Sequence, residues 1–493
     1  MMRQRTTGTG NGRSRFSFML THPEHQDIVV VGASGDLAAR KLIPALYNLF
    51  LEGALPEVCT IIGAAIQEWD REMFVTHAHD AVASFSRTPL EESQFREFSK
   101  HLAFVPLTEH GGMEAVRAAC EAPKRLIYLA IPPGAIVPVV HELEQARLVE
   151  GTSLVIEKPF GFDLASAKEL NRTIEAVFPR EQIYRIDHYL GKETVQNLLV
   201  FRFGNALFER IWNRDSIHHV EITVGESLGV EHRGAFYESV GALRDIVQNH
   251  LFQVVSLVAM EPPASFTAES MFYEQYKVFR AMEPLDPARV IRGQYAPGVA
   301  GGEKVPGYRE EPGVAKDSST ETYIAATLHV DTWRWAGVPF YIRTGKRLAR
   351  QDSRVVIVFK DVPLNVFRGT EVEEVKKNFV TIRLQPHEGI SLAFSAKLPG
   401  PSIQIDPVSM DFSYARAFKG TPPEAYERLL HDALVHDHTL FIATDIVERA
   451  WEVVQGVIDH PSPIIPYPAG SWGPEEANAM MPSGHWHMEE SEE

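Results

Sequence analysis

The sequence predicts two domains, an N-terminal α/β domain built on a parallel sheet and a larger α+β domain with a mainly antiparallel sheet. In the first domain, short Val/Ile/Leu-rich runs such as "DIVVV", "CTIIGAA", "RLIYLAIPP" and "TSLVIEKP" alternate with helical segments. Continuous apolar strands between helices are typical of a parallel sheet covered on both faces. Later strands such as "HHVEITVGE" and "FVTIRLQP" are longer and alternate apolar with polar residues, which indicates an antiparallel sheet with one wetter face.

The change in pattern divides the chain into four parts. We predict a disordered lead over 1–26, a first domain over 27–186, a second domain over 187–480 and an acidic, solvated tail over 481–493. The Gly/Pro-rich stretch 292–313 is expected to be a long excursion of the second domain. The junction carries "RIDHYLGKE", and ligand clefts often lie between domains.

Composition excludes several classes of protein. The chain has 493 residues, of which 44% are hydrophobic and 23% charged, as in ordinary soluble globular proteins. A net charge of −17 argues against a nucleic-acid or anionic-membrane partner. The only cysteines are Cys59 and Cys120, which fits a reducing compartment. Without a signal peptide or a run of ~18–20 apolar residues, we predict a cytoplasmic protein.

A glycine turn follows the first predicted strand. In "VVVGASGDLAARK", Gly32 and Gly35 lie between a buried strand and a helix, in which Pro44 predicts a kink. Glycines there let the backbone approach a pyrophosphate, which the helix N-terminus stabilises. The spacing G-x-x-G also fits a plain strand-to-helix turn. Its place after the first strand of a parallel sheet favours a Rossmann-like dinucleotide-binding domain.

A second polar group lies in "RDIVQNH". Asp245 and His250 are five residues apart, so at ~100° per residue their directions on an α-helix differ by about 140°. A lone histidine in an apolar helix is more often a satisfied core residue. It becomes a general base when a carboxylate from elsewhere meets the ring.

Seven motifs together resemble the glucose-6-phosphate dehydrogenase family: "GASGDLA", "YLAIPP", "EKPFG", "RIDHYLGKE", "RDIVQNH", "VPFYIRTGKRL" and "YPAGSWGP". The resemblance implies oxidation of D-glucose 6-phosphate at C1 to 6-phospho-D-glucono-1,5-lactone, the first oxidative step of the pentose phosphate pathway. It also implies NADP or NAD as hydride acceptor and a homodimer or homotetramer. A dehydrogenase of another phosphosugar and a catalytically silent binding paralogue remain alternatives.

The resemblance also implies roles for individual residues. His250 takes the C1 proton and Asp187 orients its ring. If "YRID" ends a strand, its period of two places Asp187 and His188 on opposite sides. The implied substrate-binding residues are Lys158, His188, Tyr189, Lys192, Glu226, Asp245 and Lys346. The implied coenzyme-binding residues are Gly32, Ser34, Gly35, Asp36, Leu37, Gln67, Pro133 and Lys158.

The sequence departs from the family pattern at two places. Ile66 stands where the family usually has the arginine that holds the 2′-phosphate of NADP. Gln67 or Arg71 is a partial replacement, and we predict an enzyme that uses NADP and also accepts NAD. Gln351 stands where many members have a basic residue, and the adjacent Arg350 is a candidate substitute.

Histidines gather near the C-terminal end. They are His431, His436 and His438 in "HDALVHDH", and His485 and His487 in "GHWH". A tetrahedral metal site needs fixed ligand geometry and outer-shell partners. Because the implied chemistry needs no metal, we predict none.

Overall fold

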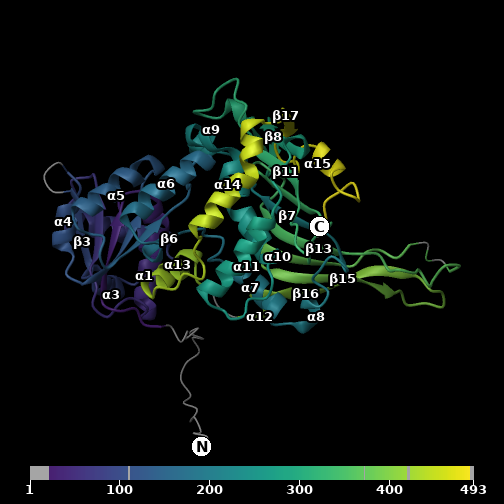
Figure 1. Cartoon of the computed structure of the whole chain (residues 1–493), viewed down its shortest axis with the longest axis horizontal. Coiled ribbons are helices and arrows are strands. Elements are labelled where there is room, and N and C mark those ends of the chain that lie inside the picture. The colour runs from purple at the N-terminus through teal and green to yellow at the C-terminus, as the bar shows by residue number, and fades with distance from the viewer. Residues whose placement is uncertain (1–20, 109–111, 371, 373, 419–421, 489–493) are drawn as a thin grey trace, which may run out of the picture.

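A computed structural model describes residues 21–108, 112–370, 372, 374–418 and 422–488. Most of the predicted lead and the last five residues of the predicted tail lie outside these ranges. Figure 1 shows the two sheets side by side along the long axis of the molecule, each with helices against it.

The first sheet is parallel and has six strands in the order β3-β2-β1-β4-β5-β6. This is the order of dinucleotide-binding doubly wound sheets. The strands are β1 (Gln26–Val31), β2 (Ile61–Ala65), β3 (Leu102–Pro106), β4 (Lys124–Leu129), β5 (Thr152–Ile156) and β6 (Ile183–Arg185). Strands β1, β2 and β5 are buried along their whole length, as their continuous apolar runs predict.

Helices cover both faces of this sheet (Figure 1). They are α1 (Ile43–Glu52), α2 (Arg71–Phe85), α3 (Glu92–Ser99), α4 (Gly112–Ala119), α5 (Ile136–Gln145) and α6 (Leu164–Val177). A π-helical turn, Ala38–Leu42, precedes α1, and Pro44 lies at the start of α1. Because proline lacks an N–H, the first turn of a helix accommodates it.

The second sheet has nine strands in the order β16-β15-β14-β13-β7-β12-β11-β8-β17. Its pairs are antiparallel except β7–β12 and β8–β17, so the prediction of a mainly antiparallel sheet is confirmed. The strands are β7 (Ile217–Gly225), β8 (Val290–Ala296), β11 (Tyr323–Leu328), β12 (Phe340–Gly345), β13 (Asp352–Phe359), β14 (Phe379–Gln385), β15 (Gly389–Lys397), β16 (Ile405–Ser413) and β17 (Ile464–Pro468).

Helices pack on one face of the second sheet (Figure 1). They are α7 (Glu193–Phe203), α8 (Ala206–Glu209), α9 (Gly234–Ala242), a π-helix (Leu243–Leu251), α10 (Phe252–Ala259), α11 (Ala268–Ala281) and α14 (Thr444–Asp459). The remaining elements are the hairpin β9 (Gly298–Ala300) and β10 (Glu303–Val305), with α12 (Tyr414–Ala417), α13 (Ala425–Leu434) and α15 (Glu476–Ala479). In the described part of the chain, none of the helices combines the length and apolar character needed to cross a bilayer.

Three parts of the second domain differ from the sequence-based expectation. The stretch 292–313 begins inside β8 rather than in an excursion, because β8 pairs with β11 and β17. Helix α13 packs against α1 of the first domain, where Arg87 forms an ion pair with Glu427. In the predicted tail, residues 482–485 are exposed as expected, whereas Trp486 is packed against the domain and only 4% exposed.

Candidate functional site

The site is built at the ends of strands from both domains. Strands β7 and β12 are parallel neighbours in register, with Gly225 opposite Gly345. Glu226 and Lys346 follow these two residues directly, so the topology places their side chains together. Lys346 Nζ contacts Glu226 Oε2 and lies 3.9 Å from Asp245 Oδ2. Because each strand ends at the same edge, the pair is fixed by the sheet itself.

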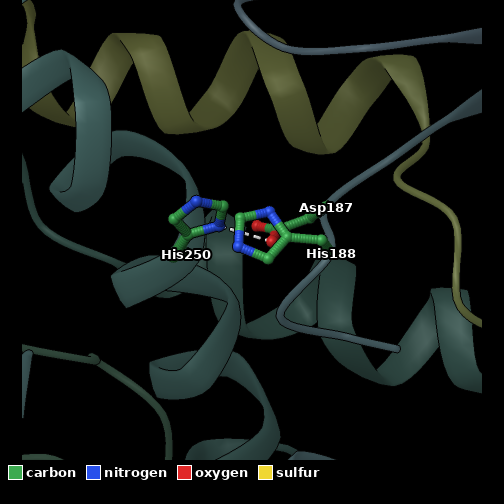
Figure 2. Close-up of side chains that lie close together, drawn as sticks. All are labelled: Asp187, His188 and His250. Carbon is green, nitrogen blue, oxygen red and sulfur yellow. Dashed lines mark hydrogen bonds and ion pairs between the residues drawn. The ribbon is translucent and has the colours of Figure 1, made fainter. Parts of the chain in front are cut away.

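Asp187 and His250 form a buried pair. Asp187 follows β6, His250 lies on the π-helix, and each is 1% exposed. His250 Nδ1 donates to Asp187 Oδ1 (Figure 2). Burial is the main cause that lowers the pKa of His250 well below its usual value, and the Lys158 cation lowers it further. The ring is therefore neutral at neutral pH and its Nε2 is the nitrogen that accepts a proton.

The π-helix changes the expected geometry around His250. Gly241, at φ +67, is a non-helical residue that kinks α9 just before its last residue, and a Cβ there would lie 2.5 Å from Glu321 Oε1. The helix then continues with π geometry over Leu243–Leu251. In a π-helix the hydrogen bond runs from i to i+5, so Asp245 and His250 are one turn apart. The predicted divergence of about 140° was wrong because it assumed α-helical geometry.

Asp187 and His188 do not point in opposite directions. The strand ends at Arg185, and the Tyr189 N–H donates to Asp187 Oδ1 in a tight turn at 2.9 Å. The ring centroids of His188 and His250 are 4.6 Å apart, and Figure 2 shows all three side chains together. The strand period therefore does not apply here. Burial lowers the pKa of His188 well below its usual value.

Tyr189 and Lys192 line the same cluster. The Tyr189 ring stacks on His250 with centroids 4.4 Å apart, and Lys192 Nζ lies 3.5 Å from the Tyr189 centroid. Burial lowers the pKa of Lys192 to about 8, although the Asp187 carboxylate opposes this. Lys192 Nζ also donates to Gln385 Oε1 at 2.8 Å. These contacts join five residues into one cluster: Asp187, His188, Tyr189, Lys192 and His250.

Lys158 lies between this cluster and the carboxylate of Asp245. It follows β5, and its Nζ donates to the carbonyl oxygen of Asp245 at 2.8 Å and to its Oδ1 at 3.0 Å. The Lys158 and Lys346 cations hold the pKa of Asp245 below its usual value despite burial, which acts the other way. Asp245 is therefore a permanently charged hydrogen-bond acceptor between two lysines.

The glycine turn has the shape that a pyrophosphate needs. Gly32 has φ +88, and a Cβ there would lie 2.2 Å from the Ala130 carbonyl oxygen. Only glycine fits this close approach of two strand ends. The Ser34 hydroxyl donates to Gln67 Oε1 at 2.5 Å, which joins the turn to the end of β2. The backbone after Gly35 enters the helix, so its N–H groups face outward for an anion.

Two family profiles cover almost the whole chain. The "glucose-6-phosphate dehydrogenase, NAD binding domain" matches 29–197 and the "C-terminal domain" of the same enzyme matches 199–487. The chain belongs to the glucose-6-phosphate dehydrogenase family. It is therefore an oxidoreductase with a nicotinamide-binding domain, and the predicted family and fold class are confirmed.

Relatives support the same assignment. The glucose-6-phosphate 1-dehydrogenase of Mycolicibacterium smegmatis is 44% identical over 482 residues, which cover 94% of this chain and 97% of the relative. The crystal structure of that enzyme from Mycobacterium avium has a TM-score of 0.84 at 37% identity, covering 96% of this chain and all of the other. A family structure in complex with glucose 6-phosphate has a TM-score of 0.86 at 32% identity, with 96% and 100% covered.

Neither Ile66 nor Arg71 takes the place of the family arginine that holds the 2′-phosphate of NADP. Ile66 is 78% exposed at the end of β2. The Arg71 guanidinium is held by the carbonyl oxygens of Ser99 and Leu102, at 2.6 and 2.9 Å. Arg71 is therefore committed to the α3–β3 connection. Gln67, bonded to Ser34, stays the predicted contact at this end.

The second departure from the family pattern is Gln351 in place of a basic residue, with Arg350 beside it. Arg350 Nε lies 3.5 Å from Asp352 Oδ2, and its guanidinium carbon lies 5.7 Å from the Trp472 ring centroid. These contacts hold Arg350 at the β13 end of the sheet. That it substitutes for the basic residue missing at Gln351 stays a prediction.

Three of the C-terminal histidines have separate partners. His431 Nε2 lies 3.1 Å from the Thr21 carbonyl oxygen. His436 Nδ1 lies 3.3 Å from Ser153 Oγ, and His438 stacks on Tyr184 with ring centroids 4.0 Å apart. His436 and His438 pack the segment after α13 against β5 and β6, whereas His431 connects α13 to the segment before β1.

Three residues that lie at or near the site were not predicted from the sequence. Gln385, the partner of Lys192, ends an alternating strand before a proline, which was its only sequence signal. Glu157 is half-buried and accepts from the Tyr128 hydroxyl at 2.5 Å. Tyr426, from α13, stacks near His188 with centroids 6.3 Å apart. Because Tyr426 is more than 200 residues after His188, nothing in the sequence indicated this contact.

Proposed function

We propose that this chain oxidises D-glucose 6-phosphate at C1, with His250 as general base and Asp187 as the residue that orients it. The observation that carries this assignment is the buried His250–Asp187 pair at the junction of the coenzyme domain and the substrate sheet. Asp187 holds Nδ1, so Nε2 of the neutral ring takes the C1 hydroxyl proton. Asp187 then stabilises the imidazolium.

The hydride leaves C1 as the proton is removed, and the sugar becomes the lactone. NADP, when bound at the glycine turn, accepts that hydride at its nicotinamide ring. The Gly32–Gly35 backbone, the Ser34 hydroxyl and Gln67 are suited to hold its phosphates and ribose. Lys158, whose Nζ contacts Asp245, is assigned to the region between coenzyme and sugar.

The phosphate group is assigned to the cationic side of the cluster. A phosphate dianion binds best to several converging donors with at least one cation. His188, Tyr189 and Lys192 offer an imidazole, a phenol and an ammonium group from one turn. Burial removes competing water, so each contact to the dianion gains strength.

The sugar hydroxyl groups are assigned to the carboxylates. Asp245 and Glu226 carry acceptor oxygens, and Lys158 and Lys346 fix their directions. Ionised acceptors in fixed positions orient a polyol through its O–H groups. This arrangement determines which carbon faces His250.

The direct test is the appearance of reduced nicotinamide. Purified protein is mixed with NADP and glucose 6-phosphate, and absorbance in the near ultraviolet is followed. We expect turnover by the wild type and a fall in kcat of at least about 100-fold in His250→Asn, because general bases contribute ~10²–10⁴-fold. Near-normal kcat in His250→Asn contradicts the assignment of the base.

Two alternatives are separated by the same assay. Higher kcat/KM with an epimeric hexose phosphate indicates a dehydrogenase of another phosphosugar. Absence of turnover with every sugar phosphate, despite coenzyme binding, indicates a silent binding paralogue. The presence of both members of the His250–Asp187 pair supports the active enzyme.

The same proposal includes a cytoplasmic homodimer or homotetramer joined through the second sheet. The support is β16, an edge strand of that sheet that carries Val408, Met410 and Phe412, with Met410 63% exposed. Residues at i, i+2 and i+4 share one face, so these three form an apolar row. Light scattering of wild type and Met410→Glu tests it; a wild-type monomer contradicts it.

A further inference from the structure

A second histidine–carboxylate group lies on the outer part of the substrate sheet. Its members are His219 and Glu221 of β7 and His487 of the C-terminal segment. One ligand atom from each residue lies within 4.8 Å of the others. His219 and Glu221 are two apart on a strand, so their side chains share a face. The C-terminal segment covers that face, with Trp486 over the Arg343 guanidinium at 4.3 Å.

The contacts inside the group converge on one carboxylate. Glu221 Oε1 lies 2.9 Å from His219 Nε2 and 2.5 Å from His487 Nδ1. The His487 backbone N–H donates to Glu221 Oε2 at 2.9 Å. His219 Nε2 and His487 Nδ1 thus both face the same carboxylate oxygen, which is the centre of the group.

Residues around the group form an outer shell. His218 Nδ1 lies 2.7 Å from His219 Nδ1, so it accepts from Nδ1–H when Nε2 of His219 is used as a ligand. A metal-bound histidine usually donates its other ring N–H in this way. Tyr341 and Phe379 place aromatic rings against His219 and His487, at centroid distances of 5.6 and 4.9 Å.

The group is separate from the catalytic cluster. Glu221 lies on β7, five residues before Glu226, which directly follows that strand; the separation is roughly 17 Å at about 3.3 Å per residue. Its side chain is 2% exposed, whereas that of His487 is 20% exposed. An ion therefore has access from the His487 side.

We propose that His219, Glu221 and His487 form a structural binding site for a divalent transition metal of the Zn²⁺ type. Two imidazoles and one carboxylate are a donor set that Zn²⁺ prefers, with water in the fourth position. At Zn–N and Zn–O distances of ~2.0–2.1 Å, tetrahedral ligand atoms are about 3.3 Å apart. Both histidine–carboxylate distances, 2.9 and 2.5 Å, lie within about 1 Å of this spacing. The metal clamps the C-terminal segment to β7, away from the chemistry.

The proposal is tested by metal binding rather than by turnover. The full chain is stripped with a chelator, dialysed, and titrated with Zn²⁺ against a chromophoric competitor. We expect about one tight Zn²⁺ per chain, and loss of affinity by at least about 100-fold in His487→Gln, since loss of an outer-shell partner alone costs about 10–100-fold. His218→Ala should weaken binding by that smaller factor. Co²⁺ absorption provides a second signal that His487→Gln removes.

Matched variants separate this site from its neighbours. His485→Ala changes an exposed histidine whose ring is 6.0 Å from that of His487 and should leave Zn²⁺ affinity unchanged. His188→Ala removes the corresponding donor of the Asp187–His188–His250 group and should also leave it unchanged. If the wild type binds Zn²⁺ no more tightly than His487→Gln, or if His188→Ala alone abolishes binding, the proposal is overturned. Circular dichroism and retained dehydrogenase activity show that His487→Gln is folded.

Discussion

The pKa of Lys192 predicts how substrate use depends on pH. Lys192 is half-buried above the Tyr189 ring, and its partial burial lowers its pKa to about 8. As a proposed phosphate-binding cation, it attracts the dianion only while protonated. The contribution is therefore present below pH 8 and lost as the pH rises through that value. The fall should occur in kcat/KM for glucose 6-phosphate, which reports groups of the free enzyme.

The expected size follows from the protonated fraction. With a pKa of about 8, Lys192 is about 90% protonated at pH 7 and about 10% protonated at pH 9, since each unit is a factor of ten. If only the ammonium form binds productively, kcat/KM falls by about tenfold between these values. At saturating substrate the bound dianion retains the proton, so the fall in kcat should begin at a higher pH.

Initial rates from pH 6 to 10 at saturating NADP measure both profiles. Lys192→Arg provides the control, because a guanidinium stays charged throughout this range. Its alkaline fall near pH 8 should disappear, even if KM is higher than in the wild type. Free glucose, which has no phosphate, should show no fall of this origin. A wild-type profile that is flat to pH 10, or an unchanged fall in Lys192→Arg, refutes the reasoning.

Four further predictions concern single residues. Asp187→Asn should lower kcat less than His250→Asn does, because the imidazole remains; a larger loss from Asp187→Asn contradicts this order. His188→Ala should raise KM for glucose 6-phosphate by roughly tenfold or more, the worth of one charge-assisted contact of about 1.5–3 kcal/mol, with little effect on free glucose as substrate; equal losses on both remove His188 from the phosphate site. Ile66→Arg should lower KM for NADP and leave KM for NAD nearly unchanged, and a wild type already highly selective for NADP would count against dual use. Gly32→Ala should weaken NADP binding measured by fluorescence titration, since its Cβ would lie 2.2 Å from the Ala130 carbonyl oxygen; unchanged affinity would mean that the turn is not the pyrophosphate site.

The sequence predicted most of the architecture because apolar patterns are local. The run "DIVVV" and its successors identified the central parallel strands, and the glycines between "VVV" and the helix marked the turn. Short or polar edge strands escaped detection. Strand β17, "IIPYP", contains two prolines that only an edge position tolerates, and its pairing with β8 joins distant parts of the chain.

The site residues were named from motifs, whereas their geometry was not accessible from the sequence. The π-helical register of Asp245 and His250 depends on Gly241 and on contacts to Glu321, which is far along the chain. The turn that brings His188 beside His250 depends on a backbone contact to Asp187. His487 was named among the C-terminal histidines, but its partners His219 and Glu221 were not, because they lie on β7, far away in the sequence.

The late return of the chain to the first domain has a consequence for folding during synthesis. The amide of Gln26, the first residue of β1, donates to the carbonyl oxygen of Leu434 at 2.7 Å, across a separation of 408 residues. Arg87 likewise has its partner on α13, where its Nε donates to Glu427 Oε1 at 2.7 Å. The first domain therefore leaves the ribosome long before Gln26 and Arg87 can reach their partners on α13. Until α13 is synthesised, these groups of the nascent domain must stay hydrated, so the domain acquires its full set of buried contacts only then.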